Sequence, residues 1–206
     1  MVKEALEAAK RLGDVETRFL SLADLKVNPC ASCWRCYTEA TAEKLCPQFD
    51  DDLQKIHENM LWADGLIMGT PVYWGSMSAQ IKAVFDRTMP FCHFASTKYK
   101  GALSHKPVAM LALAYSIHGG QEYAIQDMQK WAFVQDMICV SSGPERPVTC
   151  YYGGAGNTQP SSELNAVKKY SRYEMKNIRS TGIRLAHMAR VIKAGKDALG
   201  FKEKYE

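Results

Sequence analysis

The apolar positions between residues 65 and 88 predict a strand, a loop and a helix in that order. Gly65 to Gly69 is a short apolar run, and Thr70-Pro71 is expected to end it, because proline lacks an N–H and keeps its neighbour extended. A loop follows over residues 72–75, and a helical pattern begins at Ser76. Its apolar positions recur at the 3.6-residue period: Met77, Ile81, Val84, Phe85 and Thr88. The helix should therefore pack on a sheet, with its loop at the carboxyl edge, where open α/β sheets bind ligands.

Alternating helical and strand patterns cover most of the remaining chain. Met1 to Leu12 predicts a helix that Gly13 closes, and Val15 to Leu22 alternates as a strand does. Further helices are expected from Asp50 through Leu61, from Gln121 onward and from Ser162 to Lys193, and further strands at Pro107–Tyr115 and Met137–Val140. This order predicts an α/β domain with a parallel sheet.

The last predicted helix has one apolar stripe and one basic face. The stripe is spaced alternately four and three residues apart: Ser171, Met175, Ile178, Gly182, Leu185, Ala189 and Ile192. We expect Gly182 to permit a close helix crossing. The Lys and Arg residues are interpreted as a solvated face, because no aromatic residues interleave with them as in a nucleic-acid surface.

A second loop is expected at the same edge of the sheet. Pro107 to Tyr115 is apolar throughout, as is typical of a strand buried on both faces. Gly119 and Gly120 permit a positive φ or a close backbone approach where this strand ends, and Gln121-Glu122 begin the next helix. The two loops should therefore lie together at the ligand edge.

Four of the seven cysteines are grouped in one segment. Residues 29–36 read PCASCWRC, and Cys46 follows after a nine-residue gap. Three thiolates at two-residue intervals can reach one centre, and a fourth can complete four ligands. Three interpretations stay open: an iron-sulfur cluster, a structural zinc site, or small buried thiols packed under Trp34.

Three polar features have simpler interpretations. Asp50-Asp51-Asp52 precede a helix, where carboxylates cap the first turn, and this is favoured over a metal site. His57 lies on or beside an apolar stripe and is interpreted as a histidine at the edge of the core, not a catalytic base. Cys92 beside His93 is not interpreted as a nucleophile, because adjacent side chains rarely point at each other and no third orienting group is identifiable.

The composition is that of a single globular domain. The chain has 206 residues, of which 47% are hydrophobic, and it is expected to form one domain over residues 1–206 with a cysteine-rich loop insertion at 28–50. A net charge of +4 is too small to demand a nucleic-acid partner. There is no apolar run of about 18 residues and no secretory leader pattern at the start, so we expect a cytoplasmic protein without membrane contact and with reduced thiols.

The stretch that begins at Thr70 resembles a known family. TPVYWGSMSAQIKAVFDR is similar to the flavin loop of the flavodoxin-like NADPH-dependent FMN reductase and iron-sulfur flavoprotein family. The matching positions are Thr70, Pro71, Tyr73, Ser78, Ala79, Lys82, Asp86 and Arg87. Residues 116–122 resemble the segment of that family that runs along the flavin ring, and the cysteine pattern resembles that of its 4Fe-4S cluster.

This resemblance implies a flavodoxin-like three-layer sandwich and an FMN-dependent oxidoreductase or electron-transfer flavoprotein. NAD(P)H or a reduced carrier would be the donor, and a small molecule or protein the acceptor. The implied FMN-binding residues are Thr70, Pro71, Val72, Tyr73, Trp74, Gly75, Ser76, Ser116, His118, Gly119, Gly120 and Glu122, and the implied ligands of a 4Fe-4S cluster are Cys30, Cys33, Cys36 and Cys46. No catalytic side chain is expected, because the flavin supplies the chemistry. The resemblance also implies a homodimer or homotetramer, with Phe91 and Phe94 as candidates for a lid or an interface. A surface loop held in place by its aromatic residues is an equally open interpretation of this region.

The start of the chain departs from the family pattern. The family opens with a strand and a phosphate-binding loop, and we expect both to be missing here. In the strand order 2-1-3-4-5 the missing strand would lie between the strand at Val15 and the strand at Leu66, and its absence would leave two edges unpaired. A fragment or a wrong starting methionine, re-pairing of the sheet, and a strand from a partner are the three explanations, of which we favour the first. The competing functional class is a cofactor-free or zinc-stabilised α/β interaction module.

Overall fold

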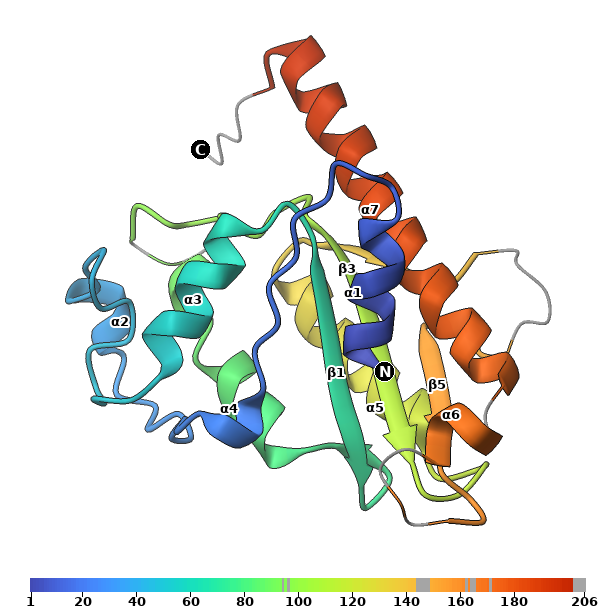
Figure 1. Cartoon of the computed structure of the whole chain (residues 1–206). Coiled ribbons are helices and arrows are strands. Elements are labelled where there is room, and N and C mark those ends of the chain that lie inside the picture. The colour runs from blue at the N-terminus through green and yellow to red at the C-terminus, as the bar shows by residue number, and fades with distance from the viewer. Residues whose placement is uncertain are drawn as a thin grey trace.

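The protein is described here from a computed structural model, which places a sheet between two layers of helices (Figure 1). The described residues are 1–93, 95, 97–143, 149–161, 163, 166–170 and 172–201. Phe94, Ser162 and Ser171, which the sequence predictions include, lie outside them. Helices α1 and α7 cover one face of the sheet, and α3, α4 and α5 cover the other. The expected three layers are therefore present.

The sheet is mostly parallel, with β3 at its centre. Its strands are β1 (Leu66–Tyr73), β2 (Ser76–Met77), β3 (Pro107–Ala114), β4 (Ile138–Val140) and β5 (Gly154–Asn157). One edge of β3 pairs with β1, with Leu66 opposite Val108 and Pro71 opposite Leu113. On its other edge β3 pairs first with β4 and then with β5, all parallel. Among the strands that the structure describes, β2 alone runs antiparallel, against the end of β1.

The helices lie close to where their apolar periodicity places them. They are α1 (Val2–Lys10), α2 (Arg35–Thr38), α3 (Leu53–Trp62), α4 (Ala79–Asp86), α5 (Gln121–Val134), α6 (Ala166–Tyr170) and α7 (Arg172–Leu199), with 3-10 turns at Leu22–Asp24 and Met89–Phe91. The close crossing expected at Gly182 is confirmed, because a Cβ added there would lie 2.1 Å from the carbonyl oxygen of Ala5. Glycine thus allows α7 to pack directly on the backbone of α1.

The position of β3 at the centre of the sheet explains why its sequence is apolar throughout. Successive side chains of a strand point to opposite faces of the sheet. Val108, Met110 and Ala112 accordingly pack with α3, α4 and α5 in the larger core. Ala109 and Leu111 pack with the α1 and α7 layer. Both faces of β3 are buried, as the sequence predicted.

Two predicted boundaries around β1 are wrong. The strand does not end at Thr70-Pro71 but continues to Tyr73, and the helix begins at Ala79 instead of Ser76. Proline is tolerated in edge strands, and among the described strands none pairs with the outer edge of β1 at Pro71, because the pairing with β2 begins only at Val72. The chain then reverses within two residues to form β2.

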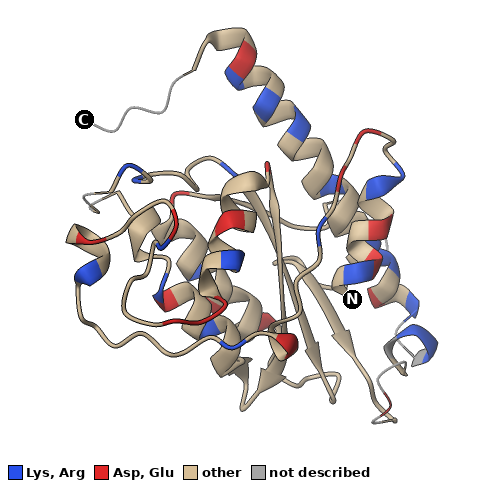
Figure 2. Ribbon diagram, turned by 60° about the vertical axis from the view of Figure 1, so that its left-hand side comes forward, with Lys and Arg blue, Asp and Glu red and all other residues tan. Residues whose placement is uncertain are grey.

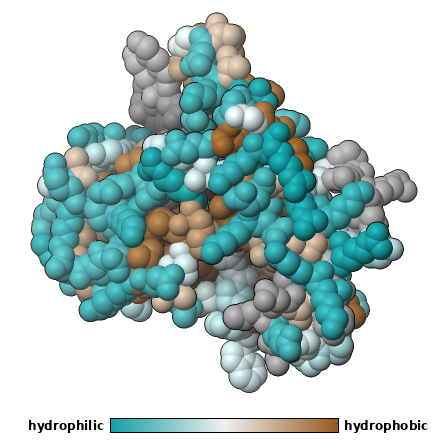
Figure 3. Space-filling model, in the orientation of Figure 1, coloured by the Kyte–Doolittle hydropathy of each residue, from teal (hydrophilic) through white to brown (hydrophobic). Residues whose placement is uncertain are grey.

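The strand expected at Val15–Leu22 is also absent from the structure, which has only the turn Leu22–Asp24 there. A strand needs a neighbour to pair with, and a groove of about 1000 Å³ separates this segment from the free edge of β1. The groove is lined by residues 14–23 on one side and by Gly65–Gly69 on the other, with α1 and α7 also contributing. Apolar side chains lie at the bottom of a hollow on this face (Figure 3).

The basic residues of α7 are balanced by acidic neighbours. Figure 2 shows Lys and Arg along the helix with Asp and Glu close by. Arg179 binds Glu4 of α1 at 2.9 Å, and Lys193 binds Asp64 at 2.8 Å. Lys193 and Asp64 are exposed, and Arg179 and Glu4 are partly exposed, which fits the interpretation of a solvated face.

Candidate functional site

The first loop at the carboxyl edge of the sheet is a tight hairpin turn. Tyr73 pairs with Ser76, so only Trp74 and Gly75 form the turn, and both have a positive φ, of 52° and 79°. Positive φ at both central residues defines the turn type that best suits a two-residue hairpin. The turn displays Trp74 fully to solvent, and the side chain of Tyr73 is 57% exposed.

Two hydroxyl groups hold this hairpin in place. The Thr70 hydroxyl accepts a hydrogen bond of 2.9 Å from the backbone N–H of Ser78, which joins β1 to the start of α4. The Ser76 hydroxyl donates to Asp127 Oδ2 of α5 at 2.6 Å. Thr70 is buried, so its side chain supports the loop from inside. Asp127 could not be found from the sequence, because its link to Ser76 spans 51 positions and no local pattern indicates it.

A buried glutamine fixes the second loop, at residues 116–120. The Gln121 side chain accepts a hydrogen bond from the Gly119 N–H at 2.9 Å and donates to the carbonyl oxygens of Ser116 and Gly156, at 2.8 and 3.2 Å. From the sequence, Gln121 was predicted only as the start of a helix. Its side chain ties the loop between β3 and α5 to strand β5.

The two loops touch each other through glycine. Gly120 has a φ of 96°, and a Cβ added there would lie 2.8 Å from the Cα of Gly75. The predicted positive φ and close backbone approach are therefore both confirmed at Gly120. The approach is to the Trp74-Gly75 turn, so the two loops form one continuous surface.

The predicted flavin residues form this surface, apart from the buried Thr70. The exposed ones are Pro71, Tyr73, Trp74, Gly75, Ser116, His118 and Glu122, and those of intermediate exposure are Val72, Ser76, Gly119 and Gly120. The assignment of these residues to FMN stays a prediction.

The four grouped cysteines line one pocket, of about 80 Å³. Cys30 and Cys33 are exposed, Cys36 and Cys46 are half-buried, and none is in a disulfide. The backbone is unusual here, because Ser32 and Trp34 have positive φ values of 51° and 61°. Within the described ranges, no three His, Cys, Asp or Glu side chains are close enough as they lie to hold a metal ion.

Burial and the neighbouring thiols disfavour negative charge on the sulfur of Cys36. Burial raises the pKa of the Cys36 thiol to about 11, and the nearby thiols of Cys46, Cys33 and Cys30 add to the shift. Crowded thiolates repel each other, and a bound cation removes this repulsion. The pocket therefore contains four sulfur donors, as a metal centre requires. In the structure these sulfurs lie too far apart for three of them to hold one metal ion.

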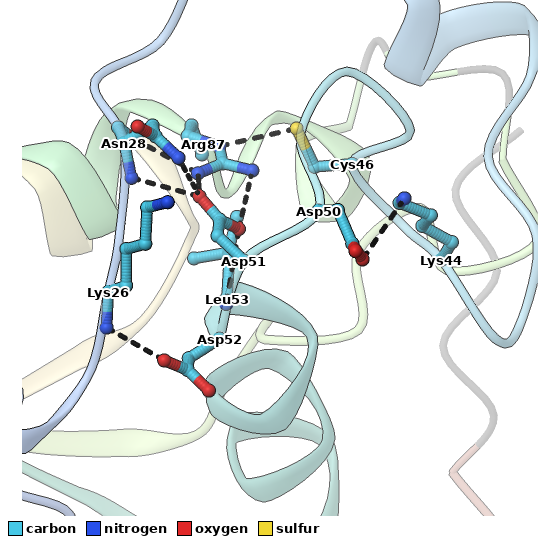
Figure 4. Close-up of polar contacts among 9 residues, drawn as sticks. All are labelled: Lys26, Asn28, Lys44, Cys46, Asp50, Asp51, Asp52, Leu53 and Arg87. Atoms are coloured by element: carbon cyan, nitrogen blue, oxygen red, sulfur yellow. Dashed lines mark hydrogen bonds and ion pairs between the residues drawn. The ribbon is translucent and has the colours of Figure 1, made fainter.

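One wall of the pocket is Arg87, which follows α4. Its Nε donates to Cys46 Sγ at 3.3 Å, and its Nη atoms bind Asp51 at 2.5 and 3.1 Å (Figure 4). Nη1 also donates to the carbonyl oxygen of Asn28 at 3.0 Å. Burial alone would raise the pKa of the Asp51 carboxyl, but hydrogen bonds from Arg87 and Asn28 outweigh it and hold that pKa at about 2. The pair is thus charged over the whole ordinary pH range.

This network corrects the interpretation of the acidic triplet. Asp52 occupies the position before α3, but it makes no side-chain hydrogen bond to the helix and instead accepts one from the N–H of Lys26. Asp51 pairs with Arg87, and Asp50 lies 3.8 Å from Lys44. Long-range partners therefore replace the predicted capping at Asp50 and Asp52, whereas Asp51 keeps part of it, because its Oδ1 also accepts a hydrogen bond of 3.4 Å from the N–H of Leu53, the first residue of α3. Among the described residues the triplet belongs to no metal-binding group.

The other singled-out polar residues are structural. His57 is completely buried against the ring of Phe91. Cys92 is buried as well, where desolvation raises its thiol pKa, so a nucleophilic role is disfavoured as expected. Phe91 is not a lid or interface residue, because it is 1% exposed and belongs to the main core.

Comparison with known proteins identifies the family. The family model described as NADPH-dependent FMN reductase matches residues 1–144. The chain belongs to the NADPH-dependent FMN reductase family. It is therefore an oxidoreductase of that family, and the resemblance carried by the Thr70 loop is confirmed.

Several similar proteins are iron-sulfur flavoproteins. One from Methanocaldococcus jannaschii is 35% identical over 193 residues, which cover 94% of this chain and 90% of that protein. Another, from Methanosarcina thermophila, is 36% identical over 140 residues, which cover 68% of each chain. The chain that contains the four-cysteine pocket is thus similar to proteins that are named iron-sulfur flavoproteins.

Solved structures support the flavodoxin-like fold. The structure of RosB with a bound riboflavin-phosphate intermediate superposes with a TM-score of 0.70 at 12% identity, covering 100% of this chain and 81% of that one. A flavone reductase gives a TM-score of 0.63 at 15% identity, over 93% of this chain and 58% of that one. At such identities the likeness concerns the fold alone. In the described part of the chain, no helix is both long and apolar enough to cross a bilayer.

Proposed function

We propose that the protein binds FMN at the joined surface of its two loops and transfers electrons through it. The observation that carries this proposal is the contact between Gly75 and Gly120, which brings the loops after β1 and β3 together at the carboxyl edge of the sheet. Ligands of open α/β sheets bind at this edge. Membership of the FMN reductase family makes a flavin the expected occupant.

The residues present suit the flat ring of a flavin. Trp74 and Tyr73 offer exposed aromatic surface, and the backbone of residues 116–120 is fixed by Gln121 and accessible at the same surface. Bound FMN would supply hydride chemistry at its N5 atom. The protein side chains would bind and orient the ring, and we assign none of them as an acid, base or nucleophile.

We further propose that Cys30, Cys33, Cys36 and Cys46 hold a 4Fe-4S cluster. Four thiols around one pocket are the donor set that such a cluster requires, and the similar iron-sulfur flavoproteins support this choice over zinc. To bind this cluster, the cysteine segment would have to bring its four sulfurs closer together. The cluster would pass single electrons onward from the flavin.

The electron donor in this proposal is NAD(P)H or a reduced carrier, and the acceptor is a small molecule or a protein. We also propose a homodimer or homotetramer. Exposed apolar side chains of Ile117 and Tyr123 beside the loop surface support an interface there.

A binding experiment tests the flavin site. FMN is titrated into the purified chain, and flavin fluorescence is followed for the wild type and for Trp74→Ala. Loss of one stacked aromatic side chain is expected to weaken binding about tenfold. Trp62→Ala is the matched control, because Trp62 lies on α3 and is also exposed. Equal affinity of Trp74→Ala and wild type would exclude the proposed stacking, and no FMN binding by the wild type would overturn the flavin site.

A further inference from the structure

Arg87 contacts both ends of the cysteine segment, residues 28–50. Its Nη1 donates to the carbonyl oxygen of Asn28, two residues before Cys30, and its Nε donates to Cys46. The guanidinium also lies 4.9 Å from the centre of the Phe49 ring. Arg87 therefore joins the start and the end of the segment at the wall of the pocket.

Asp51 fixes the orientation of this guanidinium. The two side chains are each 1% exposed, and both Nη atoms bind the carboxylate in a forked geometry. A forked pair out of contact with water restricts both side chains. With its Nη atoms held by Asp51 and Asn28, Arg87 has its single Nε–H directed at the sulfur of Cys46.

We propose that Arg87 is a positioning residue for the metal centre: it holds the Cys46 sulfur at the pocket wall and stabilises negative charge on it through the Nε–H. This inference rests on the proposed cysteine site and assigns a role that the flavin loop motif does not explain. Hydrogen bonds from a cationic group to sulfur are stronger than neutral ones. Such a bond partly compensates the negative charge of a thiolate and so weakens its repulsion of neighbouring thiolates, which favours the binding of a soft metal ion.

Arg87 should also shift the reduction potential of the proposed cluster. Hydrogen bonds to the sulfurs are among the factors that set the potential of an iron-sulfur cluster. Reduction adds negative charge, and a donor aimed at a ligand sulfur stabilises the reduced form more. Arg87 should therefore make the potential of the cluster less negative.

The test compares paired variants after anaerobic reconstitution with iron and sulfide. Arg87→Gln alone leaves Asp51 buried without its partner, so the double variant Arg87→Gln with Asp51→Asn removes both charges and avoids an uncompensated carboxylate. Arg35→Gln is the matched control. Arg35 belongs to the same segment, but its described hydrogen bonds go to Glu39 and Gln48.

Three quantities are measured on each protein: iron and sulfide content, reduction potential, and affinity for Co²⁺ from the thiolate charge-transfer absorption. We expect the double variant to keep its circular dichroism, to bind Co²⁺ about tenfold more weakly, and to have a more negative potential than wild type. Arg35→Gln should remain within about twofold of the wild-type affinity.

The outcomes separate this inference from the proposed cluster. Wild-type potential and affinity in a folded double variant would overturn the role of Arg87, as would an equal loss in Arg35→Gln. A wild type that takes up no cluster but binds Co²⁺ in an Arg87-dependent way would exclude the cluster and support Arg87. A wild type that binds neither would overturn both.

Discussion

Three residues near the cysteine segment show how burial decides the behaviour of titratable groups. Arg87 and Asp51 are charged and almost inaccessible, and they remain so because each satisfies the other. His57 lies in the same core with neither ring nitrogen hydrogen-bonded within the described residues. A buried imidazole without a partner favours its neutral form. The core therefore holds one matched ion pair and one histidine that must stay uncharged.

His57 should make folding stability depend on pH. Burial, and then the positive charge of Arg87, lower the pKa of His57 from 6.5 to about 4. Below pH 6.5 the imidazole of His57 is protonated in the unfolded chain but stays neutral in the folded chain. The contribution of His57 to folding stability is therefore fully present above pH 6.5 and is lost as the pH falls toward 4. The expected loss is about 1.4 kcal/mol per pH unit in this window.

Urea unfolding at pH 7, 6 and 5 measures this dependence. His57→Leu removes the group and should flatten the wild-type profile between these values. His187→Gln changes an exposed histidine of α7 and should leave the wild-type slope in place. If the profiles of wild type and His57→Leu were parallel, His57 would not be responsible.

At the scale of elements, the contact between the two loops depends on the absence of a side chain at Gly120. Alanine there would adopt a strained positive φ and would press on the backbone of Gly75. We expect Gly120→Ala to cost about 1–2 kcal/mol of unfolding free energy and to weaken FMN binding by separating the loops.

The control for this variant is a glycine with free space around it. Gly195 lies inside α7 with nothing within 4 Å of an added Cβ, so Gly195→Ala should stabilise the protein by about 1 kcal/mol. Urea unfolding and FMN titration are measured on both variants. Unchanged stability and FMN affinity in Gly120→Ala would show that the loop contact does not support the site.

Elements with a strong local period were predictable from the sequence, and those defined by distant partners were not. The apolar stripe of α4 and the apolar run of β3 are present as predicted, because the buried surface of each element determines the spacing of its apolar residues. The prediction of a strand at Val15 was wrong, because an alternating sequence does not by itself provide a neighbouring strand to pair with. The roles of Asp51 and Arg87, which are 36 positions apart, depend on tertiary contact that no local pattern indicates.

For the candidate site the same distinction holds. Both loops and the cysteine segment could be located from glycine, proline and cysteine spacing. Their supports could not, since Asp127 and Gln121 act through side-chain contacts across the sheet edge. The turn at Trp74 was predicted as a longer loop because the pairing of Val72 with Met77 was not foreseen.

At the scale of the whole molecule, the family and the fold agree. The family model covers residues 1–144, and the three layers match flavodoxin-like structures over the full chain. The free edge of β1 borders a groove that ends at Pro71 and Tyr73, beside the loop surface. The cysteine pocket lies next to the C-terminal end of α4, the helix that follows the first loop. One element thus connects the proposed flavin surface to the proposed cluster.

The most direct test of the account is a visible absorption spectrum of anaerobically purified protein, with released flavin, iron and acid-labile sulfide assayed on the same sample. We expect flavin bands over the broad absorption of an iron-sulfur cluster, with about one FMN and about four irons per chain. Flavin without iron would contradict the cluster at the four cysteines. A folded protein that shows neither chromophore, even after reconstitution with FMN, iron and sulfide, would contradict the proposed function as a whole.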